Sequence, residues 1–307
     1  MQKALGKLYY IIPICCLLPF FSAPLALFLG IILAFLYRGE QVVETSKLTK
    51  YLLQASIVCM GFSMSVNEVV QTGKTGFVIT VVSVLVTMLC GIALGKLFKV
   101  EKNTATLISG GTAICGGSAI AAIAPVLDAK NNQISFSLAV IFVLNAVGLF
   151  IFPTIGHLLQ MDQTHFGYWA AIAIHDTSSV VGACSAYGEQ ALQVGTTVKL
   201  TRTLWIIPLA LCIAFINKNK TSKINIPWFI FLFVVAIIIG NYLPGMEETN
   251  SHLSWLGKKG MTISLFFIGA SINIEEVKKT GVNTFLLGIL LWVIIAVLSY
   301  CWIEFVF

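Results

Sequence analysis

A series of long apolar stretches, separated by short polar loops, constrains this chain more than any other feature of its sequence. Eleven such stretches are recognisable, at residues 8–21, 23–37, 48–66, 75–98, 104–127, 133–157, 166–187, 190–216, 227–243, 255–274 and 282–303. An α-helix needs about 20 apolar residues to cross the hydrocarbon core of a bilayer, so each stretch is read as one span. Charged residues make up 10% of the 307 residues, against roughly a quarter in soluble domains. The sequence therefore predicts an all-α, polytopic membrane protein of about eleven transmembrane helices, with residues 1–307 in a single membrane domain.

The first two stretches are short and leave alternatives open. Pro19 and Pro24 surround the turn between them, so the pair forms either two spans or one bent hairpin that does not fully cross. A secretory signal is a further alternative, because Lys3 and Lys7 precede the first apolar run. No clean cleavage site with a soluble sequence follows that run, which favours membrane segments.

The distribution of basic residues orients the chain. If the N-terminus lies inside, the inner segments hold Lys3, Lys7, Arg38, Lys47, Lys50, Lys96, Lys99, Lys102, Lys218, Lys220, Lys223, Lys278 and Lys279, and the outer ones hold Lys74, Lys130, Lys258 and Lys259. The positive-inside rule then predicts a cytoplasmic N-terminus and an external C-terminus, in a bacterial inner (plasma) membrane. Residues 46, 100 and 220 are expected in the cytoplasm, and residues near 73, 130 and 248 outside. The same rule accounts for most of the net charge of +6, so we expect no nucleic-acid partner.

Part of the chain is repeated within it. Residues 61–73 and 269–281 are identical at six of thirteen positions, among them the first and last glycines of each copy. Both copies stand between two apolar stretches, and these stretches run in opposite directions in the predicted topology. The repeat is therefore inverted, with halves at approximately 23–157 and 166–303. Inverted repeats are typical of secondary transporters, which bind substrate between the two halves.

The fifth stretch is too rich in glycine for an ordinary lipid-facing helix. Two glycine pairs stand at 110–111 and 116–117, and they favour a helix that unwinds inside the membrane, next to a cavity. A half-helix that begins at Gly116, Gly117 and Ser118 would present free N–H groups and a positive dipole end to an anion, with Ser118 as a capping hydroxyl. The alternative is close helix packing through Gly117 and Ala121, which requires no ligand.

Two further stretches contain ionisable residues. His175 and Asp176 lie in the middle of the seventh stretch, and Lys199 and Arg202 lie three residues apart in the eighth. A charge at the centre of a membrane helix costs about 2.5–3.5 kcal/mol, so such residues usually face the interior, form pairs or line a pathway. Lys199 and Arg202 share one helical face that suits a single anion or carboxylate. The structural alternatives are an Asp176–Arg202 pair and a Lys199 side chain that reaches an interface.

The cysteines give no sign of a metal, a disulfide or a cofactor. All eight lie in apolar runs, without CxxC or Cys/His spacing, and are expected to be reduced core residues. An intramembrane enzyme that uses His175 with Ser118 or Cys115 is a further hypothesis. No nucleophile motif, HExxH motif or pair of catalytic acids supports it, so we expect no enzymatic activity.

At these residues the chain resembles a known family. The run from Gly111 to Ile120, the pair His175-Asp176 and the run from Val198 to Arg202, followed by Pro208, are similar to the sulfate exporter family of YeiH-type membrane proteins. That family is distantly similar to bile-acid-symporter and sodium/proton-antiporter-like transporters, which implies two crossed, broken helices and elevator-type motion. One departure is Ser179, where the family pattern leads us to expect glutamine.

The sequence thus predicts a secondary active transporter that exports a small anion, with sulfate or a sulfonate as the leading substrate. Gly116, Gly117 and Ser118 would supply N–H donors, Lys199 and Arg202 positive charge, and His175 or Asp176 a group for proton or ion coupling. The alternative is a cation/proton antiporter in which Asp176 binds the ion and Lys199 or Arg202 neutralises helix ends. The lipid bilayer surrounds the protein, and a homo-oligomer is compatible with the sequence.

Overall fold

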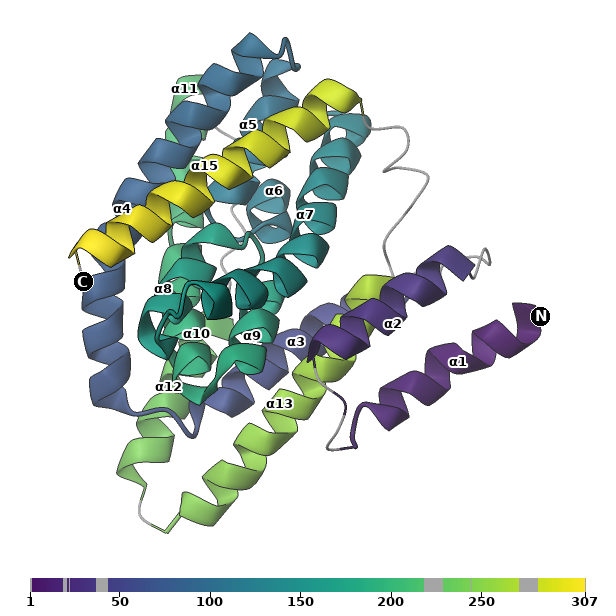
Figure 1. Ribbon diagram of the computed structural model, residues 1–307, viewed down its shortest axis with the longest axis vertical. Coiled ribbons are helices and arrows are strands. Elements are labelled where there is room, and N and C mark those ends of the chain that lie inside the picture. The colour runs from purple at the N-terminus through teal and green to yellow at the C-terminus, as the bar shows by residue number, and fades with distance from the viewer. Residues whose placement is uncertain are drawn as a thin grey trace. The chain divides into compact units, whose positions relative to one another are not determined.

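The computed structural model describes residues 2–18, 21, 23–36, 44–217, 229–243, 245–270 and 281–306, and every regular element in this part is an α-helix (Figure 1). Among these residues, four helices are long and apolar enough to cross a membrane, at Val69–Leu97, Asn132–Leu158, Glu189–Ile213 and Val282–Phe305. Shorter apolar helices cover Leu25–Leu36, Tyr51–Gly61 and Phe229–Tyr242. The prediction of an all-α, polytopic membrane protein is confirmed.

The chain folds into two compact units. The first unit comprises Met1–Gln71 and Pro227–Ile274 and contains α1 (Gln2–Cys15), α2 (Ala23–Leu36), α3 (Glu44–Gly61), α12 (Phe229–Tyr242) and α13 (Glu247–Ala270). The second unit comprises Thr72–Ile226 and Glu275–Phe307 and contains most of α4 (Val66–Leu97), with α5 (Lys102–Ala113), α6 (Gly117–Ile123), α7 (Asn131–Leu158), α8 (Gln163–Ala173), α9 (Thr177–Tyr187), α10 (Glu189–Thr203), α11 (Ile206–Asn217) and α15 (Val282–Val306). Each unit takes segments from both halves of the predicted repeat, and the repeat itself stays a prediction.

In the first unit, two glycines let α2 and α13 pack backbone to backbone. A Cβ atom on Gly30 would lie 2.2 Å from the carbonyl oxygen of Phe266, and one on Gly269 would lie 2.4 Å from that of Leu27. Small residues at such crossings are typical of membrane helices. Gly269 opens the second repeat copy, as Gly61 opens the first at the end of α3. Most of the second copy, residues 271–280, lies outside the described residues.

In the second unit, α5 and α6 form a helical hairpin, here called the first hairpin. A Cβ atom on Gly110 would lie 2.5 Å from Cδ1 of Ile123, and Asn103 Nδ2 donates a hydrogen bond to the carbonyl of Leu127 at 3.3 Å. In a continuous helix, residues 110 and 123 would be about 20 Å apart. The expected break near Gly116 is present, but the stretch 104–127 turns back there instead of crossing as one span.

The helices α8 and α9 form the second hairpin in the same way. The Phe166 and Tyr187 rings stack with centroids 3.7 Å apart, and Gln163 Oε1 accepts a hydrogen bond from the N–H of Gln190 at 3.0 Å. The 11 residues of α8 extend about 16 Å, roughly half of the hydrocarbon thickness. The stretch 166–187 therefore also returns to the side from which it starts, and the prediction that it forms a single span is corrected.

The two hairpins start from opposite ends of α7. Glu101, before α5, accepts a hydrogen bond from Gln133 at the beginning of α7, whereas the His157 ring near its end stacks on Tyr187 of the second hairpin at 4.3 Å. The 28 residues of α7 extend about 42 Å, enough to cross a bilayer. The start of α7 therefore lies beside the start of α5, and the expectation that residues 100 and 130 lie on opposite sides is corrected. Because two spans become hairpins, the predicted sides of both termini are unchanged.

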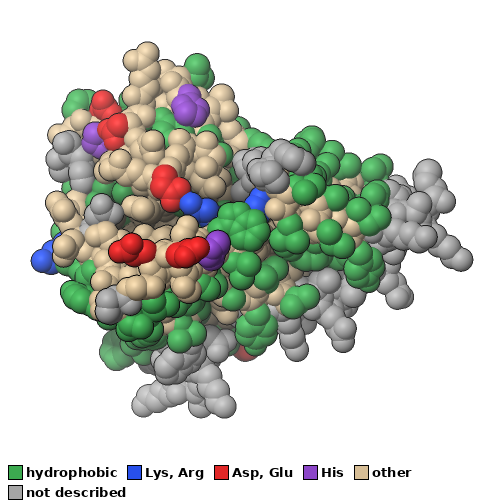
Figure 2. Space-filling model, turned by 90° about the horizontal axis from the view of Figure 1, so that it is seen from below, with side chains coloured by type: hydrophobic (Ala, Val, Ile, Leu, Met, Phe, Trp, Pro, Cys, Tyr) green, Lys and Arg blue, Asp and Glu red, His purple; other side chains and the backbone are tan. Residues whose placement is uncertain are grey.

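Hydrophobic side chains cover large areas of the surface seen in Figure 2, and acidic, basic and histidine side chains lie among them. With Lys130 on the inner side, the predicted excess of basic residues on that side becomes larger.

The hairpins make a prediction about accessibility. In a background without native cysteines, single cysteines at positions 100 and 130 should be labelled by a membrane-impermeant thiol reagent from the same side. A cysteine at position 160, beyond α7, should be labelled from the other side. If cysteines at positions 130 and 160 were labelled from the same side, α7 would not cross the membrane and the hairpin arrangement would be contradicted.

Candidate functional site

The tips of the two hairpins meet in the interior of the second unit. A Cβ atom on Gly116, in the first tip, would lie 3.3 Å from Cβ of Asp176 in the second. The N–H of Asp176 donates a hydrogen bond of 3.1 Å to Oδ1 of Asn145, in the middle of α7. The candidate site is therefore built from both tips, α7 and α10.

The carbonyl groups at the C-terminal end of α8 are occupied by side chains from other helices. Lys199 Nζ, on α10, donates to the carbonyl oxygens of Ala171 at 3.2 Å and Ile174 at 2.8 Å. Trp292 Nε1, on α15, donates to that of Ala173 at 3.0 Å. The last four carbonyls of a helix have no partner inside it, and burying them unpaired is costly. These side chains let α8 end inside the protein.

Arg202 joins the two hairpins. Its Nη1 donates to the carbonyls of Ala171, at 3.2 Å, and Ile172, and its Nη2 donates to the carbonyl of Thr112 at the end of α5, at 3.3 Å. One guanidinium thus binds the C-terminal ends of helices from both hairpins, which its planar fork of donors permits and a lysine does not. A cation also opposes the negative ends of the two helix dipoles.

Asp176 has a role that differs from the predicted ion pair. Its Oδ2 accepts hydrogen bonds from the N–H of Ser178, at 3.0 Å, and from the Ser178 hydroxyl, so it caps the N-terminus of α9. Among the described residues no salt bridge joins it to Arg202. Lys199 has no exposed surface and therefore does not extend to an interface either.

The predicted anion-binding residues divide into two groups. Gly117 and Ser118, at the start of α6, are partly or fully exposed, and Gly116 precedes them with a φ of +65° and ψ of −124°. Lys199 and Arg202 are completely buried, and their donors are directed at backbone carbonyls. The structure places all five residues in one unit, where the two cations hold the framework of the tips.

Several buried polar atoms of this region have no hydrogen-bond partner in the described part of the chain. They are both ring nitrogens of His175, Nδ2 of Asn145, Nε of Arg202 and the hydroxyls of Thr112 and Thr196. Most are donors, and buried donors normally have an acceptor. Asn145 was not selected from the sequence, although an amide in the middle of an apolar span is itself a signal.

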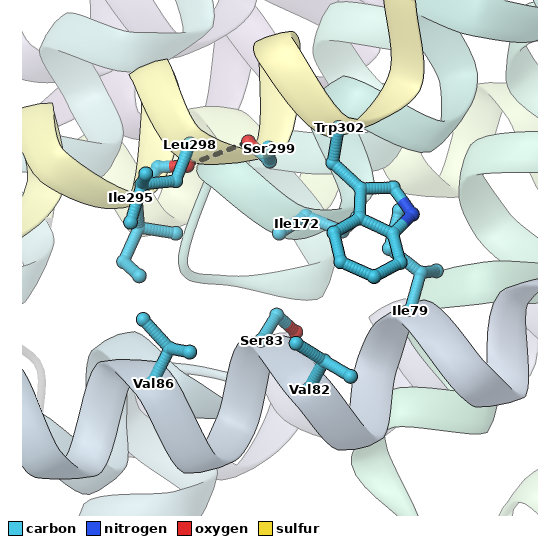
Figure 3. A pocket seen from close by; sticks show the side chains of 9 residues that line it. All are labelled: Ile79, Val82, Ser83, Val86, Ile172, Ile295, Leu298, Ser299 and Trp302. Atoms are coloured by element: carbon cyan, nitrogen blue, oxygen red, sulfur yellow. Dashed lines mark hydrogen bonds between the residues drawn. The ribbon is translucent and has the colours of Figure 1, made fainter. Parts of the chain in front are cut away.

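The cavity in Figure 3 lies elsewhere in the unit and has a different chemistry. It has a volume of about 190 Å³ and lies between α4, α8 and α15, lined by Ile79, Val82, Ser83, Val86, Ile172, Ile295, Leu298, Ser299 and Trp302. Its serine hydroxyls donate to carbonyls of their own helices, those of Thr80 and Ile295. An apolar cavity of this kind does not suit an anion, and the hairpin tips remain the candidate site.

Comparison with known proteins places this architecture among membrane proteins. The family described as conserved hypothetical protein 698 matches residues 16–288. A UPF0324 membrane protein of Bacteroides thetaiotaomicron is 51% identical over 287 residues, which cover 93% of this chain and 87% of the relative. One from Photobacterium profundum is 45% identical over 300 residues, covering 97% and 92%, and one from Porphyromonas gingivalis is 49% identical over 287 residues, covering 92% and 87%. No solved structure matches the chain significantly.

The conformation of Gly116 generates a structural prediction. Any side chain at this φ and ψ is strained by about 1–3 kcal/mol, and a Cβ atom would also approach Ile141 to 3.2 Å. Gly116→Ala should therefore lower the thermal unfolding midpoint of the purified protein. Gly73→Ala, inside α4 where the nearest atom is 4.0 Å from the new Cβ, is the matched control and should raise or preserve the midpoint. Equal midpoints for the two variants would show that the tip tolerates a side chain at position 116.

Proposed function

This chain belongs to the conserved hypothetical protein 698 family, and we propose that it is a secondary active transporter that carries a small anion through the site at the hairpin tips. The resemblance to sulfate exporters favours export, with sulfate or a sulfonate as substrate, across a bacterial inner membrane. In this proposal the N-terminus is cytoplasmic and the C-terminus external. No cofactor and no nucleic-acid partner take part.

The observation that carries the proposal is an imbalance between donors and acceptors. The carbonyls at the ends of α8 and α5 are occupied by Lys199, Arg202 and Trp292, and one oxygen of the Asp176 carboxylate, Oδ2, is bonded to Ser178. Buried donors on Arg202, Asn145 and His175 have no acceptor. A cation would require free acceptors, whereas an anion supplies acceptors to free donors.

The proposed site combines groups from three elements. The start of α6, with Gly117 and Ser118, offers backbone N–H groups, and Asn145 offers its amide from α7. The N–H of Gly116, which was also expected to bind the anion, donates instead to the carbonyl of Gly111 at 2.9 Å. Lys199 and Arg202 stabilise the bound anion through their positive charge, because charges interact strongly in a low-dielectric interior. All of these residues belong to the second unit, so the elevator-type motion that the resemblance implies would carry the site as one body.

His175 and Asp176 are the proposed coupling pair. His175 is buried beside Asp176, Lys199 and Arg202, and its ring lies 6.3 Å from that of Trp292. An imidazole without hydrogen-bond partners can exchange a proton without breaking a bond to the protein.

Cation/proton antiport is the second candidate, and one observation favours it. Lys199 and Arg202 lie on helix C-termini from the two hairpins, as that hypothesis expects, and Asp176 is the partly exposed carboxylate at the tips. The two candidates differ in the sign of the ligand charge, which the variants below distinguish.

We also propose that the protein is not an enzyme. Neither ring nitrogen of His175 is hydrogen-bonded, so His175 forms no activated pair with Ser118 or Cys115, the nucleophiles that such a reaction would use.

Substitution of Asn145 tests most directly whether the site binds an anion or a cation. Asn145→Asp keeps an oxygen for the Asp176 N–H but replaces the free donor with a negative oxygen. Sulfate and methanesulfonate affinity, measured by calorimetry on purified protein, should fall at least about tenfold, since a hydrogen bond to a charged group contributes about 1.5–3 kcal/mol. Asn283→Asp, which adds the same charge at an exposed position of the same unit, should bind normally. Unchanged anion affinity in Asn145→Asp, or a gain of sodium binding, would favour the antiporter.

The coupling pair is tested by pH. His175→Gln should flatten the pH dependence of anion uptake into proteoliposomes under an imposed proton gradient, and anion binding should stay measurable. His157→Gln, on the exposed end of α7, is the control and should keep the wild-type profile. A wild-type pH profile in both His175→Gln and Asp176→Asn would remove proton coupling from this pair.

A further inference from the structure

The hairpin tips hold the buried charges of the described chain. Among its Lys, Arg, Asp and Glu residues, the buried side chains are those of Lys199 and Arg202, both with 0% of their surface exposed. Asp176, partly exposed, adds the nearest carboxylate, since it lies directly against the first tip at Gly116. The remaining acidic and basic groups of the second unit lie toward the helix ends or on the surface, as Glu101, Asp162 and Glu189 do.

The helix dipoles at this point nearly cancel. Each tip brings one helix C-terminus, of α5 or α8, and one N-terminus, of α6 or α9. Each end corresponds to about half a charge, negative at a C-terminus and positive at an N-terminus. With the His175 imidazole neutral, two positive side chains and one carboxylate therefore leave about one positive charge at the site.

We infer that the site selects a monovalent oxyanion, such as an organic sulfonate, over divalent sulfate. This inference rests on the proposed function and narrows its substrate class. An uncompensated charge in a low-dielectric interior is strongly unfavourable. A single negative charge neutralises the tips, whereas a divalent ion leaves a net negative charge among them and has a larger desolvation penalty. The free donors of Asn145, Arg202 and His175 suit the oxygens of a sulfonate group.

The experiment compares methanesulfonate and sulfate binding to the purified full-length protein by calorimetry at one pH. The wild type should bind methanesulfonate at least tenfold more tightly. Asp176→Asn adds one positive charge and keeps a residue that caps a helix well, so it should move the ratio of the two affinities at least tenfold toward sulfate. Lys199→Gln removes one positive charge and should move the ratio the other way, away from sulfate.

Asp162→Asn is the matched control. Asp162 caps α8 at the base of the same hairpin, accepting hydrogen bonds from the N–H groups of Thr164 at 2.8 Å and His165 at 3.0 Å, and its removal changes the same charge far from the tips. The ratio should stay at the wild-type value in this variant.

The outcomes are distinct. Tighter binding of sulfate by the wild type, or a ratio that neither Asp176→Asn nor Lys199→Gln changes, would overturn the selection of a monovalent ion and leave anion transport standing. Binding of neither anion by folded wild-type protein would overturn the proposed function itself.

Discussion

Helices that end inside a membrane protein leave their terminal backbone groups without water, and the second unit is organised around this constraint. Two hairpins place four helix ends together in the interior of the unit. Their C-terminal carbonyls are paired by Lys199, Arg202 and Trp292, which come from α10 and α15. The positions of α10 and α15 against the hairpins follow from this requirement, since each must bring its donor to the tip of the second hairpin.

The same pairing determines what the tips offer a ligand. Because long cationic side chains occupy the carbonyls, the site is left with donors that have no acceptor, on Asn145 and His175 among others. Lys199 and Arg202, which the sequence motif suggests as direct ligands of the substrate, are thus buried side chains that support the hairpin tips. Their charge still acts over the short distance to the tips, and their geometry holds both hairpins through one guanidinium.

The bases of the hairpins are closed by amides. Gln133 accepts a hydrogen bond from the backbone N–H of Lys130 at 2.8 Å and donates to Glu101, and Gln163 accepts from the N–H of Gln190 at 3.0 Å. In each case a neutral side chain forms a hydrogen bond that links the start of a hairpin to the helix that follows it. The pairing holds each hairpin closed at its base.

The sequence by itself determined that the chain is a helical membrane protein, and it pointed to most residues of the candidate site. Apolar stretches near 20 residues indicate helices within a bilayer, the glycine pairs around Gly116 predict a break, and the cost of buried charge singles out His175, Asp176, Lys199 and Arg202. It did not determine that the fifth and seventh stretches turn back, because hydropathy counts apolar length and is the same for one span and for a hairpin of two short helices. Nor did it determine the partners of Lys199 and Arg202, because a motif records spacing along one helix, whereas the carbonyls at its side come from residues 25 to 90 positions away. Those partners exist only when both hairpins are folded against α10.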